Sequence, residues 1–242
     1  MQPSRPTGMF PETRWSLILR TRAAETPEAA ARALDELCRV YWQPLYAYLR
    51  RSGQDSETAK DSVQGFLANF LSRNGFERFG PANGRFRHFL LGSLRNYTLS
   101  EMRKEAALKR GGQTEMVALD IEEAEQVFRT QAPEGLSPEA SFDRQWAQTI
   151  WSRALARLRE EHRNRGKEAL FDVLKGALTR DDEPSTAGLA AATGMSAGTV
   201  TVAVHRMRRR LRDLVVDEIA QTVGADGDLE EELDYFLSIL SK

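Results

Sequence analysis

The sequence predicts an all-α protein of two helical domains joined by an acidic linker. Apolar residues recur at helical spacing along nearly the whole chain, and we find no convincing alternation of the kind that marks a half-buried strand. The stretch 184–213 has the turn chemistry of a helix-turn-helix. Basic and acidic residues gather in separate blocks. With 242 residues, the chain can form one large or two small domains with real cores.

We divide the chain into five segments by composition and periodicity. They are an N-terminal extension (1–26), a first helical domain (27–112), an acidic linker (113–136), a second helical domain with the helix-turn-helix (137–223) and an acidic C-terminal helix (224–242). Pro44 is expected to interrupt or restart the helix that begins near Pro27, because proline lacks a backbone N–H. Ser137 followed by Pro138 is a good helix start, and that helix is expected to end at the polar stretch HRNRGK (162–167).

Two further helices are predicted in the first domain. One is capped by Asp55 or Ser56 and ends near Arg73, and its buried side is made by Ala59, Val63, Phe66, Leu67 and Phe70. The other runs from Phe86 to about Arg110 and stops at Gly111 and Gly112.

The net charge of −1 hides a strong polarisation along the chain. Residues 85–110 and 204–212 are basic, whereas 111–140 and 217–242 are acidic. Such blocks favour binding to a polyanion despite the near-neutral sum. The single cysteine, Cys38, lies among apolar residues and excludes an internal disulfide. Without a secretory signal or a membrane-length apolar run, we expect a soluble cytoplasmic protein.

The helix-turn-helix is predicted from its turn and its two helical faces. Gly194 suits the turn, and Ser196 can cap the second helix. One face of that helix is apolar (Met195, Val200, Ala203, Met207 and Leu211). Hydroxyls and arginines cover the rest, as suits a helix that contacts base edges and phosphates. The alternative is an ordinary amphipathic helix pair whose arginines are only solvated.

Several motifs resemble a bacterial RNA polymerase sigma factor of the extracytoplasmic-function class, in a subgroup with extensions at both ends. The pattern D-x-x-Q-x-F-L at 61–67 resembles the signature of sigma region 2 that docks on core polymerase. GRFRHFLLGSLRNYTLSEMRK (84–104) resembles the part of region 2 that opens the −10 promoter element. GMSAGTVTVAVHRMRRRLR (194–212) resembles region 4, which reads the −35 element. MFPETRWS (9–16) and EIAQTV (218–223) resemble the flanks of that subgroup.

The resemblance implies a transcription initiation factor whose partners are core RNA polymerase and promoter DNA. It assigns core binding to Asp61, Gln64 and Phe66. It assigns the −10 element to Asn83, Arg85, Phe86, Arg87, Arg95, Asn96, Arg103 and Lys104. It assigns the −35 element to Ser196, Thr199, Thr201, Val202, His205, Arg206, Arg208 and Arg209. Gly65 and Thr201 depart from the residues common at these positions, and 161–167 resembles an insertion.

The loop 73–85 is expected, by the resemblance, to form the pocket for an unstacked base. Its aromatic residues and Phe86 suit stacking on a base. We expect Phe89 to be a core residue, and we favour a DNA role for Asn83, Arg85 and Arg87 because no core needs them. For Arg95, Arg103 and Lys104, farther along the helix predicted to begin at Phe86, the alternative is that they form a solvated helix face.

The two acidic segments leave several roles open. The linker can lie in a positively charged channel for nucleic acid or serve only as a flexible tether. The C-terminal helix has an apolar stripe of Leu229, Leu233, Phe236, Leu237 and Leu240. We expect it to fold back on the second domain, with its acids facing the recognition-helix arginines, as a brace or as an inhibitor. Control by a separate anti-sigma protein is the other option.

Two other classes of function compete with initiation. Catalysis is not expected, because His88, His162 and His205 are scattered and no phosphate-binding glycine loop is present. No cofactor and no metal are predicted. A one-component repressor or activator is the second alternative, with residues 10–110 as a ligand-binding or dimerisation domain.

Overall fold

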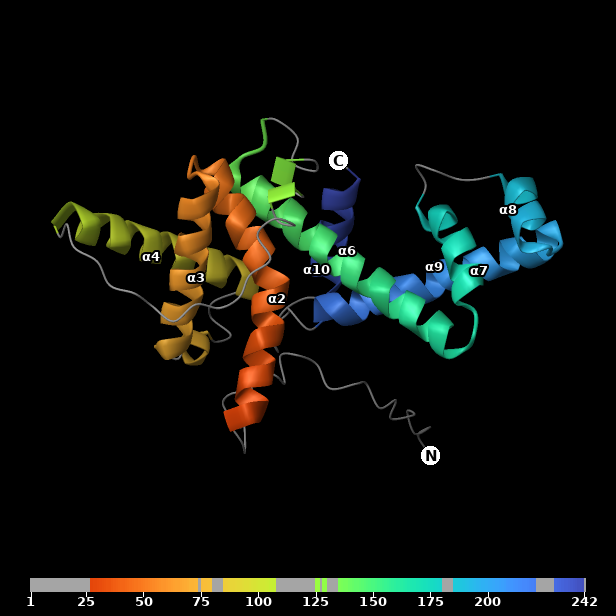
Figure 1. Cartoon of the computed structure of the whole chain (residues 1–242), viewed down its shortest axis with the longest axis horizontal. Coiled ribbons are helices and arrows are strands. Elements are labelled where there is room, and N and C mark those ends of the chain that lie inside the picture. Colours follow the sequence, from red (N-terminus) through yellow and green to blue (C-terminus); the bar gives the residue numbers. More distant parts are fainter. Residues whose placement is uncertain are drawn as a thin grey trace, which may run out of the picture. The chain divides into compact units, whose positions relative to one another are not determined.

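The computed structural model describes residues 27–73, 75–79, 85–107, 125–126, 128–129, 135–179, 185–220 and 229–241 (Figure 1). These residues form helices and their connections, and no strand occurs among them. The chain falls into two compact units, which are described separately. Unit 1 comprises Met1–Ala147 and Ala220–Lys242, and unit 2 comprises Gln148–Ile219. The five-segment division stays a prediction, and its N-terminal extension lies outside the described residues.

Helix α2 (Pro27–Arg51) is continuous through Pro44, so the expected interruption there is wrong. The residues beside this proline, Trp42, Leu45 and Tyr46, are all buried. Packing against α3 (Ser56–Ser72) and α4 (Phe86–Ala107) therefore offsets the lost backbone hydrogen bond. Cys38 is buried on the same helix, as predicted for a core residue.

Helix α3 (Ser56–Ser72) begins as the sequence predicts. The Asp55 carboxylate caps it, because one oxygen accepts from the backbone N–H of Thr58 at 2.9 Å. Its buried face is the predicted one, made by Ala59, Val63, Phe66, Leu67 and Phe70, with Gln64 added. This face packs against α2 and α4 in the core of unit 1.

A short 3-10 helix, η1 (Gly75–Arg78), leads from α3 toward α4 (Phe86–Ala107). Phe79 and Phe86 are both almost fully buried, with ring centroids 5.2 Å apart. Gly75 lies so close to α3 that a Cβ there would come within 2.6 Å of the Phe70 ring. Residues 108–110, where the sequence ends this helix, lie outside the described residues.

Part of the predicted linker is helical and contacts α2. Residues 125–126 and 128–129 are helical. The Arg50 guanidinium donates to both carboxylate oxygens of Glu125, at 3.0 and 2.9 Å, and the Tyr46 hydroxyl donates to the same carboxylate at 2.5 Å. These donors lower the pKa of Glu125 to about 2, with the Arg50 hydrogen bond as the largest cause.

Helix α6 (Pro138–Asn164) begins at the predicted serine–proline pair and ends at the predicted polar break. The Ser137 hydroxyl accepts from the backbone N–H of Ala140 at 3.1 Å. The division between the two units falls within this helix. Helix α7 (Glu168–Leu174) and the 3-10 helix η3 (Lys175–Leu178) follow, and they bury Phe171 and Leu174 in unit 2.

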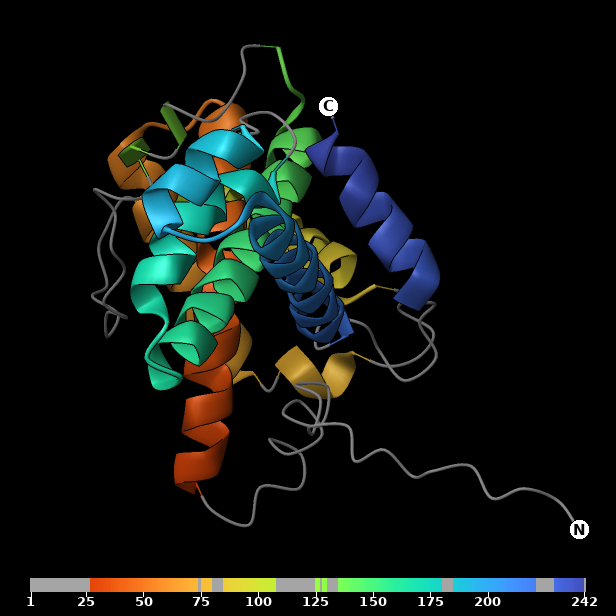
Figure 2. The same cartoon turned by 90° about the vertical axis from the view of Figure 1, so that its right-hand side faces the viewer.

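Helix α10 (Leu229–Leu240) belongs to unit 1, and Figure 2 shows it beside the start of α6. The expectation that it folds back on the second domain is therefore wrong, and its acids pair with Arg85 and Arg87 instead of the recognition-helix arginines. The predicted apolar stripe is wrong in part, since Leu237 is 53% and Leu240 is 41% exposed. Glu232 and Phe236 are the buried residues of this helix. Arg85 and Arg87, at the start of α4, form ion pairs with acids of this helix, and apolar periodicity does not report such contacts.

Within the described ranges, no single helix has both the length and the apolar character needed to cross a membrane. Helices α8 (Thr186–Thr193) and α9 (Ala197–Ala220) together pass that test across a 99° bend.

Candidate nucleic-acid interface

The helix-turn-helix of unit 2 has the predicted geometry. Helix α8 (Thr186–Thr193) and helix α9 (Ala197–Ala220) meet at 99°, within the range typical of this motif. Gly194 has φ of 67° in the turn, a left-handed conformation that glycine adopts without steric cost. Ser185 caps α8 by accepting from the backbone N–H of Gly188 at 3.1 Å. The turn between the helices is therefore set by local sequence.

Three hydroxyls at the start of α9 (Ala197–Ala220) are engaged locally. The Ser196 hydroxyl accepts from the backbone N–H of Thr199 at 3.2 Å and lies 2.8 Å from the Thr199 hydroxyl. The Thr201 hydroxyl donates to the carbonyl of Ala197 at 3.0 Å. Ser196 is exposed, but its hydroxyl acts first as the helix cap. A hydroxyl here that contacts a DNA base must also keep its local hydrogen bond. Otherwise, contacts to bases come from residues farther along α9.

The face of α9 opposite the core is exposed and mixes basic, polar and small apolar side chains. Val200, Met207 and Leu211 point into unit 2 and are buried, as predicted. The exposed predicted residues are Ser196, Thr199, Thr201, Val202, His205, Arg206 and Arg209. Hydroxyls, a methyl-bearing side chain and guanidinium groups on one helix can contact base edges and phosphates in a major groove.

Arg208 differs from the other predicted DNA-contacting residues, because it anchors the fold. Its Nε donates to the carbonyl of Ala177 in η3 at 2.9 Å, and the side chain is half-buried. The prediction that it binds DNA did not foresee this contact, because residue 177 is 31 positions away in the chain. Arg208 therefore fixes α9 against the preceding helices.

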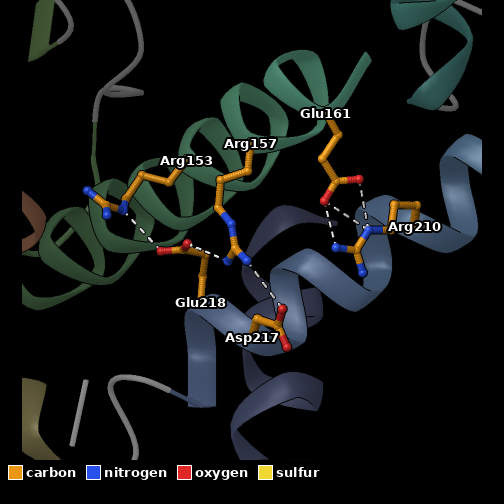
Figure 3. Close-up of polar contacts among 6 residues, drawn as sticks. All are labelled: Arg153, Arg157, Glu161, Arg210, Asp217 and Glu218. Carbon is orange, nitrogen blue, oxygen red and sulfur yellow. Dashed lines mark hydrogen bonds and ion pairs between the residues drawn. The ribbon is translucent and has the colours of Figure 1, made fainter. Parts of the chain in front are cut away.

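Ion pairs hold the second half of α9 on α6 (Figure 3). Arg210 donates to the Glu161 carboxylate through Nε and Nη2, with distances from 2.6 to 3.1 Å, and this lowers the pKa of Glu161. Glu218 is 1% exposed and accepts from Arg153 and Arg157 at 3.0 and 2.9 Å. These contacts lie within unit 2 and orient the recognition helix.

A cavity in unit 1 lies between α3, η1 and α4. Its volume is about 230 Å³, and a cavity of about 150 Å³ accommodates benzene. Aromatic rings, amides, hydroxyls and arginines line it: Phe66, Asn69, Phe70, Arg73, Gly75, Arg78, Phe89, Ser93, Asn96, Tyr97, Ser100 and Glu101. This combination suits an aromatic group that also carries hydrogen-bonding atoms.

The sequence placed such a pocket in the loop 73–85 with Phe86, and the structure assigns different residues to the cavity. Phe86 is 1% exposed and packs on Tyr41 and Phe79, so its assignment as a base-contacting residue is wrong. Phe89, expected in the core, is half-buried and lines the cavity. Asn69, Ser93 and Tyr97 were missed. The signal for them was the helical register of α3 and α4, which brings one polar face of each helix together.

Farther along α4, the predicted DNA-binding side chains are exposed. Asn96 and Arg103 lie on the surface, and Asn96 also lines the cavity. Arg95 donates to the hydroxyl of Tyr48 at 2.8 Å and forms an ion pair with Glu139. Asn83 and the side chain of Lys104 lie outside the described residues.

Arg85 and Arg87, at the start of α4, are covered by α10. Arg87 is 1% exposed and forms ion pairs with Asp143 and Glu232. Arg85 is half-buried and pairs with Glu231 at 2.6 Å and with Glu232 at 2.8 Å. The expectation that no core needs Arg87 is therefore wrong, because the partner helix comes from the far end of the chain. Burial lowers the pKa of the Arg87 guanidinium, and Asp143 opposes that shift.

Arg87 lies between two aromatic rings. Its guanidinium carbon is 4.6 Å from the Trp146 ring centroid and 4.8 Å from that of Tyr235. The Tyr235 hydroxyl donates to the Asp143 carboxylate at 2.7 Å, and burial with this hydrogen bond raises the pKa of Tyr235 to about 12. Arg87 Nη2 and Trp146 Nε1 are buried without a hydrogen-bond partner among the described residues. Each such unsatisfied buried donor lowers the free energy of unfolding by about 1–3 kcal/mol.

The predicted polymerase-binding residues of α3 separate into exposed and buried. Asp61 is exposed, whereas Gln64 and Phe66 are buried. Gln64 and Phe66 face the core of unit 1 beside Val63 and Leu67, so Asp61 is the exposed member of the set that the resemblance assigned to polymerase binding. Gly65 packs against α4, where a Cβ would come within 2.4 Å of the Tyr97 hydroxyl. Glycine at this departure from the family pattern therefore has a packing reason.

No family of known proteins, no curated protein and no solved structure matches this chain. Among the described residues, no three histidine, cysteine, aspartate or glutamate side chains gather as a metal site would require.

Proposed function

We propose that this protein is a transcription initiation factor that directs core RNA polymerase to specific promoters, as the resemblance to extracytoplasmic-function sigma factors implies. The observation that carries the proposal is the capped helix pair α8–α9, whose 99° angle leaves a basic and hydroxyl-rich face of α9 exposed. The motifs of the first domain extend that observation from DNA binding to initiation.

In this proposal, α9 reads the duplex at the −35 element. Thr199, Val202 and His205 are exposed along α9 and supply contacts to base edges. Arg206 and Arg209 are exposed on the same helix and supply contacts to phosphates. Arg208 and Arg210 hold α9 on the rest of unit 2, so that its exposed face is presented as a rigid surface.

The cavity between α3 and α4 is our candidate for capture of an unstacked base at the −10 element. Strand opening must compensate lost stacking, and stacking on an aromatic ring contributes about 1–3 kcal/mol per base. Phe70, Phe89 and Tyr97 bring aromatic rings to the cavity, while Asn69 and Asn96 bring hydrogen-bonding amides. Arg73 and Arg78 are exposed at the same cavity and can neutralise phosphates.

Docking on core polymerase is assigned to the exposed side of α3 around Asp61. This carboxylate is the exposed member of the predicted set, so it can be changed without disturbing the core. Glu57, one turn earlier and also exposed, provides a charge-matched control on the same helix.

Run-off transcription with purified bacterial core polymerase tests the proposal directly. Genomic DNA fragments from the native host are transcribed with core alone and with core plus this protein. We expect new, specific start sites that require the protein. Those starts should be lost with Asp61→Ala and retained with Glu57→Ala, and both variants should keep the melting temperature of the original protein.

The result also separates initiation from the competing function. A protein that binds specific duplexes but produces no new start, with core polymerase from its own host, is a repressor or activator instead. Such regulators commonly bind as dimers to paired half-sites, so the footprint and the stoichiometry on DNA then identify the class.

A further inference from the structure

Helix α10 covers the basic start of α4 with acidic side chains. Glu231 pairs with Arg85, and Glu232 pairs with both Arg85 and Arg87. Glu232 is almost fully buried in this contact, together with Arg87. Two neighbouring carboxylates thus occupy the positions at which two guanidinium groups could donate to phosphate oxygens.

The floor beneath α10 is aromatic. Phe236 of α10 packs against Trp146, with ring centroids 6.1 Å apart at an interplanar angle of 88°. Trp146 also carries Arg87 on its face at 4.6 Å. When α10 departs, an indole and two guanidinium groups lie side by side, which is the combination that binds single-stranded nucleic acid by stacking and charge.

The contact made by α10 leaves hydrogen-bonding capacity unused. Arg87 Nη2 and Trp146 Nε1 are buried donors without a partner among the described residues. A phosphodiester, like a carboxylate, presents two charged oxygens that guanidinium N–H groups can contact. On its other side, α10 leaves Leu237 and Leu240 exposed, so it is held through one narrow face. These features suit an exchangeable occupant better than a fixed part of the core.

We propose that α10 is an internal competitor for single-stranded DNA at a site formed by Arg85, Arg87 and Trp146. The DNA-binding role of this surface rests on the proposed function, whereas the competition by α10 adds a control to it. In the free protein, the carboxylates of Glu231 and Glu232 stand in for phosphates. Displacement of α10 exposes both arginines to the strand, so the full chain binds single strands weakly until α10 is released.

The test measures fluorescence anisotropy of a labelled mixed-sequence single-stranded oligonucleotide titrated with the full-length chain. Glu232→Gln removes the carboxylate that both arginines share, with little change of shape. Asp234→Asn removes one charge from an exposed position of the same helix and is the matched control. Phe236→Asp places a carboxylate at a buried position and forces α10 out of its site.

We expect the dissociation constant to fall roughly tenfold or more with Phe236→Asp, because two freed arginines can each neutralise a phosphate. The slope of log affinity against log salt should steepen by about 1–2. Glu232→Gln should move in the same direction by a smaller factor, and Asp234→Asn should match the original protein. Adding Arg85→Ala to Phe236→Asp should remove part of the gain, which a purely structural role for α10 does not explain.

Amide hydrogen exchange of residues 229–241 reports whether α10 is released in each variant. If α10 is released and single-strand affinity is unchanged, the helix is only a brace and the proposal is wrong. If affinity is unchanged but release strengthens binding to core polymerase, the covered surface is a protein interface and the proposal is equally wrong. The anisotropy assay contains no polymerase, so it tests the competition by α10 separately from initiation. If run-off transcription fails but Phe236→Asp still binds single strands more tightly, only the initiation function is wrong.

Discussion

The arginines of α9 and the arginines at the start of α4 carry the same sequence signal but have different surroundings. Arg206 and Arg209 are exposed on α9. Arg85 and Arg87 are covered by acids of α10, and Arg87 is fully enclosed between two aromatic rings. Both pairs were predicted to bind DNA. The difference lies in whether a distant acidic segment reaches them.

This comparison shows that a basic cluster in a sequence indicates binding to negative charge. It does not indicate whether that charge belongs to DNA or to acidic residues of the same chain. In unit 2, Glu161 forms an ion pair with Arg210, and the outer face of α9 stays exposed. In unit 1, Glu231 and Glu232 form ion pairs with both Arg85 and Arg87. A chain of net charge −1 has enough acids to satisfy its own arginines, so tertiary contacts decide which of them face solvent.

The largest effect is expected where the covered cluster meets the core. Trp146→Ala removes a fully buried indole that supports both Arg87 and Phe236. The free energy of unfolding should fall by about 3–5 kcal/mol, as measured by urea denaturation. Trp151→Ala, on the same helix but half-buried, should cost less. A loss below about 1 kcal/mol for Trp146→Ala would show that the covered cluster is loosely packed.

The exposed cluster should respond in DNA affinity instead of stability. Arg206→Ala with Arg209→Ala should weaken duplex binding strongly and reduce the steepness of its salt dependence by about 2, one unit for each phosphate contact. Stability should stay within about 0.5 kcal/mol, because both side chains are exposed. Binding is measured by anisotropy at several salt concentrations.

Arg208→Ala is the control on the same helix for that experiment. It removes the hydrogen bond to the carbonyl of Ala177 and should lower the free energy of unfolding by about 1–2 kcal/mol. An unchanged salt slope in the double variant, with a reduced slope in Arg208→Ala, would reverse the assignment of these arginines.

A smaller effect on stability is expected for Gly194, in the turn between α8 and α9. Gly194→Ala places a Cβ at φ of 67° and should cost about 1–2 kcal/mol, although no atom crowds the site. Gly198→Ala, in the first turn of α9, also meets no neighbour and has no left-handed backbone. It should be neutral or stabilise by up to about 1 kcal/mol. Equal effects of the two substitutions in thermal unfolding would contradict the assigned turn.

The smallest effect concerns a third acid–arginine contact, between Glu125 and Arg50. The folded-state pKa of Glu125 is about 2, below its usual 4.5, so the ionised carboxylate stabilises the fold above pH 4.5. Glu125→Gln should cost about 1 kcal/mol at pH 7. That difference should shrink as the pH falls from 4.5 toward 2. Melting temperatures across this range test it, with exposed Glu57→Gln as a control that shows no such trend.

Local patterns in the sequence predicted the elements that depend on near neighbours. Ser137 and Ser196 were predicted as caps, and Asp55 was one of two candidates with Ser56, because a cap bonds a residue three positions on. The buried faces of α3 and of the start of α9 followed from helical periodicity alone. Pro44 was misjudged, because local propensity was outweighed by burial of its neighbours in the core.

The candidate site was predicted less completely than the fold. The exposed face of α9 followed from one helix, so its residues were found. The cavity between α3 and α4 combines faces of two different helices, and the register within one helix does not report which other helix lies opposite. Arg87 was assigned to DNA because its ion-pair partner Asp143 lies 56 positions away. No local pattern reports such a contact.

By itself, the sequence determined an all-helical fold among the described residues, the capped helix starts and the helix-turn-helix. Backbone hydrogen bonds, caps and a left-handed glycine act over a few residues. Tertiary structure decided which charges are exposed. It buried Arg87 under α10, tied Arg208 and Arg210 to unit 2, and turned Leu237 and Leu240 to the surface. Coulomb attraction and aromatic packing act through space between residues far apart in the chain, so only the folded arrangement sets their outcome.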